Sequence, residues 1–211
     1  YLFMQGGWGR VELGGNTDAA EALSVNSSTF ASATGGVDGD FYRYAAAPTG
    51  GFTGVVRPDL VLANAGNGVA ANGFAAGEVN EDATKITYYS PRFAGFQAGV
   101  SYAPNSGSTG VTAPGATVTG GFNDVFAAGI NYAAQWDSIG FKAAVTGQVG
   151  DAIVATDNDL EAWDAGVNLT FAGFTVGGSY GDLSDSLSPA AASIDSDYWD
   201  AGVGYEFGAF S

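Results

Sequence analysis

The chain has 211 residues, of which 22 are acidic and six are basic, and it contains neither histidine nor cysteine. A net charge of −16 argues against nucleic acid as a partner, because phosphate binding depends on Lys and Arg that release counterions. Without imidazoles and thiols the chain lacks the usual general bases, nucleophiles, zinc ligands and disulfides, so the composition predicts neither an enzyme nor a bound cofactor.

The composition also favours an all-β fold. Thirty-four glycines and 13% aromatic residues are unlike a helical protein or a disordered acidic tail. No apolar run approaches the roughly 18 residues that a transmembrane helix needs. The strands of a closed barrel, in contrast, need only about 9–11 residues of alternating hydrophobicity. The sequence is therefore compatible with a membrane protein of this kind.

The first predicted strand covers residues 8–13, where the polar residues Arg10 and Glu12 alternate with apolar neighbours. Glycine and asparagine then end the strand, and residues 15–80 show no sustained hydrophobic period. A stretch of this length without regular elements is uncommon in a compact protein and is usually functional.

Residues 83–104 predict a β-hairpin, because two alternating runs flank the break at Ser90-Pro91-Arg92. The second run has one apolar face with Phe96, Ala98, Val100 and Tyr102, and one polar face with Gln97, Gly99 and Ser101. One face suits hydrocarbon and the other suits water, although a soluble sandwich would alternate in the same way.

Further alternating runs follow along the chain. They cover residues 124–136, 139–145, 163–171, 174–180 and 199–207. Together with the earlier runs they predict about eight strands, joined alternately by very short turns and by long loops. This alternation is typical of outer-membrane barrels, in which the turns lie on one side of the membrane and the loops on the other.

The two faces of the predicted strands differ in the charge of their side chains as well as in the size of those side chains. The face rich in aromatic and aliphatic residues carries no charge, and the opposite face carries Arg10, Glu12, Lys85, Lys142, Asp164, Asp200 and Glu206. Because a Lys or Arg at lipid depth costs about 2–4 kcal/mol, this separation favours a transmembrane antiparallel β-barrel. The polar face is otherwise built from small residues, which would leave voids in an eight-stranded barrel. We therefore expect a wider barrel of about sixteen strands, of which the chain is the central part without the N- and C-terminal strands.

Two stretches of the chain resemble the general porins of Gram-negative outer membranes, most closely those of α-proteobacteria. They are Gly7–Gly14 (GWGRVELG) and Ile86–Pro104, which contains ITYYSPRFAGF and GVSYAP. The resemblance implies that residues 1–211 form a single porin barrel domain in the lipid bilayer of the outer membrane, as a homotrimer. It also implies passive diffusion of small hydrophilic solutes and ions, with the third loop, residues 15–80, folded into the barrel as a constriction.

Fixed charges of both signs in a wet channel select permeants by their sign and orient dipolar solutes. We expect the pore lining and constriction to include Arg10, Glu12, Asp38, Asp40, Arg43, Lys85 and Lys142. Because acids outnumber bases, the sequence predicts a preference for cations. The alternative interpretation of the loop acids is that they only solvate the loop.

Two alternatives concern calcium. Asp157, Asp159 and Glu161 supply the oxygen ligands that Ca²⁺ prefers, but they lack the spacing of an EF-hand, so solvated loop charge is the simpler interpretation. For the whole chain, the competing hypothesis is a secreted, acidic, Ca²⁺-binding β-solenoid or adhesin. That hypothesis predicts short tandem repeats with Asp at fixed spacing, whereas the one matching fragment, residues 35–40, does not recur.

Overall fold

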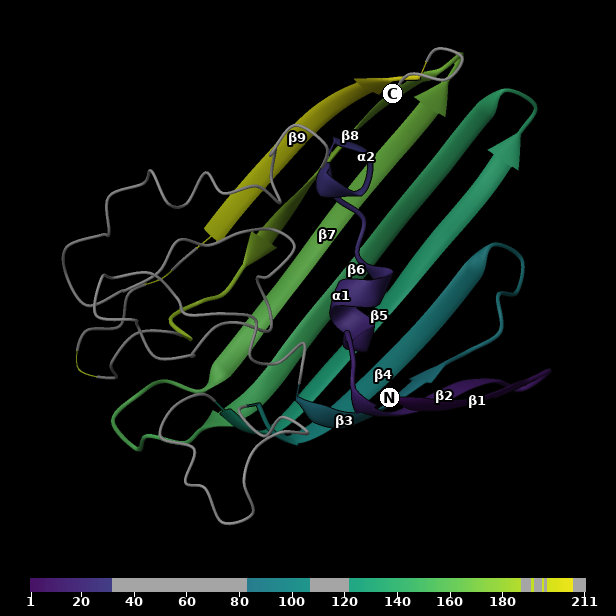
Figure 1. Ribbon diagram of the computed structural model, residues 1–211. Coiled ribbons are helices and arrows are strands. Elements are labelled where there is room, and N and C mark those ends of the chain that lie inside the picture. Colours follow the sequence, from purple (N-terminus) through teal and green to yellow (C-terminus); the bar gives the residue numbers. More distant parts are fainter. Residues whose placement is uncertain (32–82, 107–121, 187–190, 192–194, 196, 207–211) are drawn as a thin grey trace.

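The computed structural model describes residues 1–31, 83–106, 122–186, 191, 195 and 197–206. Within these residues nine strands form one antiparallel sheet, and each strand pairs with its neighbours in the chain (Figure 1). The strands are β1 (Leu2–Gly6), β2 (Gly9–Gly15), β3 (Thr84–Tyr89), β4 (Phe96–Asn105), β5 (Phe122–Trp136), β6 (Ile139–Ala152), β7 (Leu160–Phe171), β8 (Phe174–Asp182) and β9 (Asp197–Tyr205). The predicted all-β, antiparallel fold class is confirmed.

The described part of the connection between β2 and β3, residues 16–31, contains two short helices, in the stretch for which the sequence predicted no regular element. They are α1 (Ala19–Leu23) and α2 (Ser28–Ala31). Among the described residues, no helix has the length and apolar character that crossing a membrane requires.

The sheet has one strand more than the eight predicted, because β1 was missed. Its five residues carry large side chains on both faces, so the alternation is too short to recognise. β1 pairs with β2 from Leu2 opposite Leu13 to Gly6 opposite Gly9. The predicted strand start at Trp8 was wrong by one residue, because Trp8 lies in the turn and β2 begins at Gly9. Gly9 has a φ of 118°, which residues with a side chain rarely adopt.

The strands run between two unlike ends of the sheet. At the short-turn end, turns of two to six residues join β1 to β2, β3 to β4, β5 to β6 and β7 to β8. These turns lie toward the upper right of Figure 1. At the long-loop end, the connections between β2 and β3, β4 and β5, β6 and β7, and β8 and β9 are longer. The predicted alternation of short turns and long loops is confirmed.

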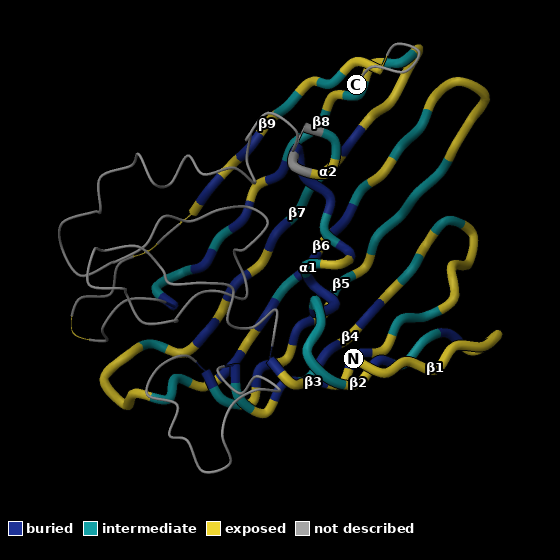
Figure 2. The backbone as a smooth tube through the Cα atoms, in the orientation of Figure 1, coloured by how far each residue is buried: buried dark blue, intermediate teal, exposed yellow. Residues whose placement is uncertain are grey.

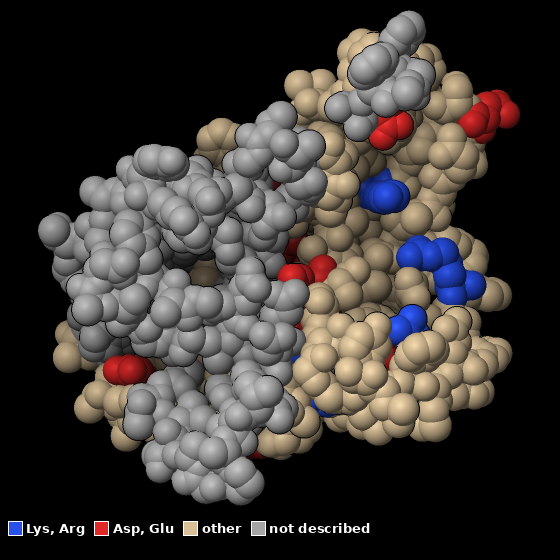
Figure 3. Space-filling model, in the orientation of Figure 1, with Lys and Arg blue, Asp and Glu red and all other residues tan. Residues whose placement is uncertain are grey.

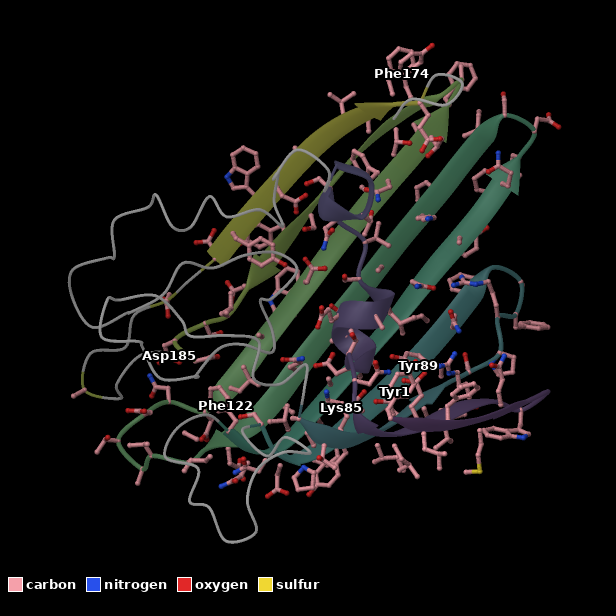
Figure 4. All side chains as sticks on the ribbon, viewed as in Figure 1. Tyr1, Lys85, Tyr89, Phe122, Phe174 and Asp185 are labelled. Atoms are coloured by element: carbon pink, nitrogen blue, oxygen red, sulfur yellow. The ribbon has the colours of Figure 1, made fainter. Side chains whose placement is uncertain are left out.

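The outer face of the sheet exposes large apolar side chains. Ile130, Val145 and Val176 lie within strands, yet they are 48%, 54% and 55% exposed. Water-soluble monomers rarely expose a continuous apolar surface of this kind, whereas lipid hydrocarbon would cover it. Paired aromatic rings lie on this face near the short-turn end, with Phe174 and Tyr205 separated by 4.3 Å between ring centroids (Figure 4). Such rings suit the level of the lipid headgroups.

The inner face carries small and polar side chains. Figure 2 shows the buried stretches of the strands running behind α1 and α2. Its buried polar side chains include Thr87, Ser101, Thr146, Gln148, Asp164, Asn168, Ser179 and Asp200. The polar face of the barrel wall is therefore partly covered by another segment of the same chain.

Replacing Ile130 by lysine is expected to destabilise the protein in a bilayer by about 2–4 kcal/mol, because this outer side chain lies midway along β5. The matched control is Gln135→Lys, on the inner face of the same strand, which should fold like the wild type. Both variants would be refolded into lipid vesicles, and the free energy of unfolding would be measured by urea titration. Equal stabilities of the two variants would contradict the assignment of the faces.

Candidate functional site

Residues 16–31 follow β2 and lie across the inner face of the sheet, and we call them the anchored segment. In it, α1 begins after Asp18, whose Oδ1 accepts hydrogen bonds from the backbone N–H groups of Ala20 and Glu21 at 2.9 and 3.1 Å. This N-cap satisfies two donors that the first helical turn leaves without a partner. α1 contacts strands β3 to β6 and α2 contacts β9, so the segment crosses most of the sheet (Figure 1).

Glycines of the inner face provide the space that the anchored segment occupies. A Cβ atom at Gly129 would lie 3.2 Å from Cβ of Leu23, and one at Gly166 would overlap with the carbonyl oxygen of Val25. The same applies to Gly99, Gly202 and Gly204, where a Cβ would meet Leu23, Ser27 and Phe30. The segment therefore lies in a trough that exists because these positions have no side chain.

Buried hydrogen bonds hold the first half of the segment to β3, β4 and β6. Nε2 of Gln148 donates to Oδ2 of Asp18 at 2.5 Å. The backbone N–H of Ala19 donates to Oγ of Ser101 at 2.8 Å, and that hydroxyl also hydrogen bonds to Thr87. A hydrogen bond to a charged group contributes about 1.5–3 kcal/mol, so the carboxylate of Asp18 is the strongest of these anchors.

A second set of hydrogen bonds holds the other half of the segment to β7 and β9, and β8 supports Asp200. The backbone N–H of Ser27 donates to Oδ1 of Asp200 at 2.7 Å. Oδ2 of Asp200 accepts from both the backbone N–H and the hydroxyl of Ser179. Nδ2 of Asn168 donates to the carbonyl oxygen of Asn26 at 3.2 Å. The segment is thus held at both ends by groups that are buried with it.

Three of the predicted pore-lining residues lie on β2 and β3, the two strands between which the anchored segment lies in the chain. Nε of Arg10 is 2.5 Å from Oε1 of Glu12, and its guanidinium stands 4.3 Å from the ring centroid of Phe3. Glu12 is 5% exposed and accepts a hydrogen bond from the side chain of Asn16. Lys85 is 4% exposed, and its ammonium group donates to the backbone oxygen of Asn16 (Figure 4). Glu12 and Lys85 therefore face the segment, whereas Arg10 lies at its edge.

Lys142 and Arg92 lie on the inner face toward the short-turn end. Lys142 is exposed on β6, between positions 133 and 168 of the neighbouring strands. Arg92, which was not among the predicted site residues, donates to Oε1 of Gln97 at 2.9 Å and to Oδ1 of Asn131 at 2.8 Å. Figure 3 shows basic side chains gathered on this side of the molecule.

A cavity of about 540 Å³ opens between α1 and the short-turn ends of β1 to β4. Its lining includes Arg10, Glu12, Tyr89, Arg92 and Gln97. The walls combine charges of both signs with neutral hydrogen-bonding groups, so the cavity suits water and small hydrophilic solutes better than an apolar ligand.

Other predicted residues lie outside the described residues or at the long-loop end. Asp38, Asp40 and Arg43 belong to the part of the 15–80 loop that lies outside the described residues. Asp157, Asp159 and Glu161 are exposed beside the connection from β6 to β7, where Oδ1 of Asp159 accepts from the backbone N–H of residue 152. In the described ranges, no three Asp, Glu, His or Cys side chains are grouped so that they would hold a metal ion.

The anchors Asp18, Gln148 and Asp200 were missed as site residues, although the sequence carries a signal for one of them. Asp18 followed by Glu21 three positions later is the spacing of a helix N-terminus. Gln148 and Asp200 give no comparable signal, because their partners lie 130 and 173 residues away in the chain.

Comparison with known proteins extends these observations. A family model described as Gram-negative porin matches residues 1–211. Uncharacterized proteins of Rickettsia typhi and Rickettsia felis are each 26% identical to this chain, over 89% of its length and 54% of theirs. A third, from Rickettsia conorii, is 25% identical with the same coverage. The chain thus spans about half the length of the curated relatives it matches, and no solved structure matches it significantly.

Proposed function

Because the chain belongs to the Gram-negative porin family, we propose that it forms part of the wall of a water-filled pore in the bacterial outer membrane. Small hydrophilic solutes and ions would cross this pore by passive diffusion. The observation that carries the proposal is the anchored segment, which is held flat on the polar face of a sheet whose other face is apolar. A segment held in this way narrows the interior of a barrel without blocking it.

We propose a barrel of about sixteen strands that assembles as a homotrimer, with residues 1–211 as one barrel domain and residues 15–80 as its constriction. The matches to Rickettsia proteins agree with the α-proteobacterial resemblance. Diffusion through such a pore needs no catalysis and no cofactor, and Ca²⁺ bound by the acids at 157–161 stays a separate prediction.

The competing β-solenoid or adhesin gains no support. The described strands form one sheet in which every neighbouring pair is antiparallel. A parallel β-helix would instead stack successive coils with parallel strands. The family match also covers the whole chain.

Single-channel recording in planar bilayers tests the pore. The folded protein is expected to produce discrete conductance steps that increase in proportion to the conductivity of the salt solution, and a trimer should add its steps in threes. Heat-denatured protein from the same preparation is the control. Folded protein that inserts into the bilayer and conducts no ions would contradict the proposal.

We propose that the pore prefers cations, since acids outnumber bases by 22 to six. The reversal potential in a salt gradient should therefore have the sign expected for cation flow. Lys142→Gln removes an exposed positive charge from the inner face and should raise the cation-to-anion permeability ratio by about twofold. Lys142→Arg keeps the charge and should leave the ratio unchanged. A reversal potential of the opposite sign in the wild-type protein would show that the proposed preference is wrong.

A further inference from the structure

The described acids concentrate at the long-loop end of the sheet. Nine of them lie in the described loops or near the loop ends of β5 to β9, and seven of the nine are exposed. They are Asp124, Asp151, Asp157, Asp159, Glu161, Asp182, Asp185, Asp195 and Asp197. No Lys or Arg follows residue 142, so the later strands and loops add no positive charge to this end.

The described bases concentrate at the opposite, short-turn end. Arg10 directly follows the first residue of β2, Arg92 lies in the turn between β3 and β4, and Lys142 is the fourth residue of β6. Figure 3 shows the basic groups on the inner face, toward the short turns. The acids described at this end are Glu12, which pairs with Arg10 at 2.5 Å, and Asp137 and Glu206 near two turns.

Between the two ends, the charges of the inner face are engaged in contacts within the protein. Lys85 is 4% exposed and donates to the backbone of the anchored segment. Asp18, Asp164 and Asp200 are each at most 9% exposed, and they accept hydrogen bonds from Gln148, Tyr198 and Ser27. Among the described residues, the charges that mobile ions can reach are therefore mainly acidic at the long-loop end, whereas the three bases and three acids at the short-turn end balance one another.

We infer that the pore rectifies ionic current, a property that rests on the proposed function because it requires an open channel. An acidic end holds an excess of cations, whereas an end with balanced charges holds no excess of either ion. When the long-loop side is positive, the voltage drives cations from the acidic end into the neutral end, where anions from the opposite solution accompany them, so ions accumulate and conductance rises. The opposite voltage draws both kinds of ion out and lowers the conductance.

The salt dependence of this effect follows from screening. The Debye length is about 30 Å at 0.01 M salt and about 3 Å at 1 M. Wall charges therefore control the ions across the whole width of a pore only at low salt. The current ratio between opposite voltages should be about two at 0.01 M and close to one at 1 M.

The test is single-channel recording of the full-length protein at 0.01, 0.1 and 1 M potassium chloride, with both voltage signs. The orientation of each inserted channel must be known. Thr156→Cys places a thiol on an exposed residue of the loop between β6 and β7, and the chain contains no other cysteine. A membrane-impermeant thiol reagent applied to one side then reports which side the long loops face. The larger current is expected with the long-loop side positive.

Two variants of the hairpin formed by β5 and β6 test whether the charges of this chain cause the rectification. Lys142→Gln removes a positive charge from the short-turn end and should lower the current ratio at 0.01 M. Asp137→Asn removes a negative charge from the same end and should raise it, and asparagine tolerates the φ of 50° at this position. Equal currents of both signs through open, oriented wild-type channels at 0.01 M would overturn the inference while leaving the pore intact. The inference would also be overturned if both variants shifted the current ratio in the same direction. Absence of conductance would instead contradict the pore itself.

Discussion

Replacing Gly166 by leucine is expected to lift the anchored segment off the barrel wall. A Cβ at this position would overlap with the backbone carbonyl oxygen of Val25, and a backbone atom cannot move aside as a flexible side chain can. Overpacking of this kind costs about 1–3 kcal/mol. Because cleavage by a protease follows the population of the opened state, cleavage after Leu23, which is 3% exposed, should become about 5- to 150-fold faster.

The matched control for this variant is Ala165→Leu. Ala165 is the neighbouring residue of β7 and points to the outer face, where a larger side chain meets lipid, so cleavage after Leu23 should be unchanged. Gly166→Ala already introduces the Cβ and should show the effect in part. A folded Gly166→Leu protein that is cleaved as slowly as the wild type would show that the segment does not rest on Gly166.

Asp18→Ala is expected to open the first half of the anchored segment. The variant removes the N-cap of α1, worth about 0.5–2 kcal/mol, and leaves the buried amide of Gln148 without its acceptor, at about 1–3 kcal/mol. Together these losses amount to about 1.5–5 kcal/mol. Hydrogen–deuterium exchange of the peptide covering residues 18–24 should therefore be about 10- to 4,000-fold faster.

Asp18→Asn is the conservative counterpart, and it should be nearly as protected as the wild type. Its carbonyl oxygen can cap α1, and its amide can donate to Oε1 of Gln148 after the Gln148 amide rotates. That oxygen is buried and has no hydrogen-bond partner in the wild-type structure. A double-mutant cycle with Gln148→Leu completes the test, since the two losses should be far from additive if the pair interacts. Additive effects would contradict the contact.

The strands of this protein could be predicted because their signal is local. In β5 and β6, alternate residues face lipid and the others face the inside, so the two-residue period shows in the sequence itself. The same signal failed for β1, whose five residues are too few to show a period. It also failed for α1, where the only local indication is the cap residue Asp18.

The small residues of the inner face were placed correctly on the polar face of the strands, but only one of their two roles was predicted. Their size predicted a wide interior with room for water and a folded-in loop. The structure shows that the anchored segment also rests on Gly129, Gly166 and Gly202, because its backbone and side-chain atoms lie where side chains at these positions would be. Nothing in the neighbourhood of these glycines along the chain distinguishes them from the glycines of the turns.

The sequence by itself determined the fold class, the division of each strand into a lipid face and a polar face, and the excess of negative charge. These depend on the type of each residue and on its immediate neighbours.

Only the tertiary structure decided which polar residues hold the anchored segment and which charges remain exposed. Asp200 meets Ser27 across 173 residues, and Gln148 meets Asp18 across 130, so their roles depend on strand order and register. Lys85 and Lys142 carry the same charge on the same face, but one lies under the segment and the other beyond it. That difference arises only when the chain folds back on its own sheet.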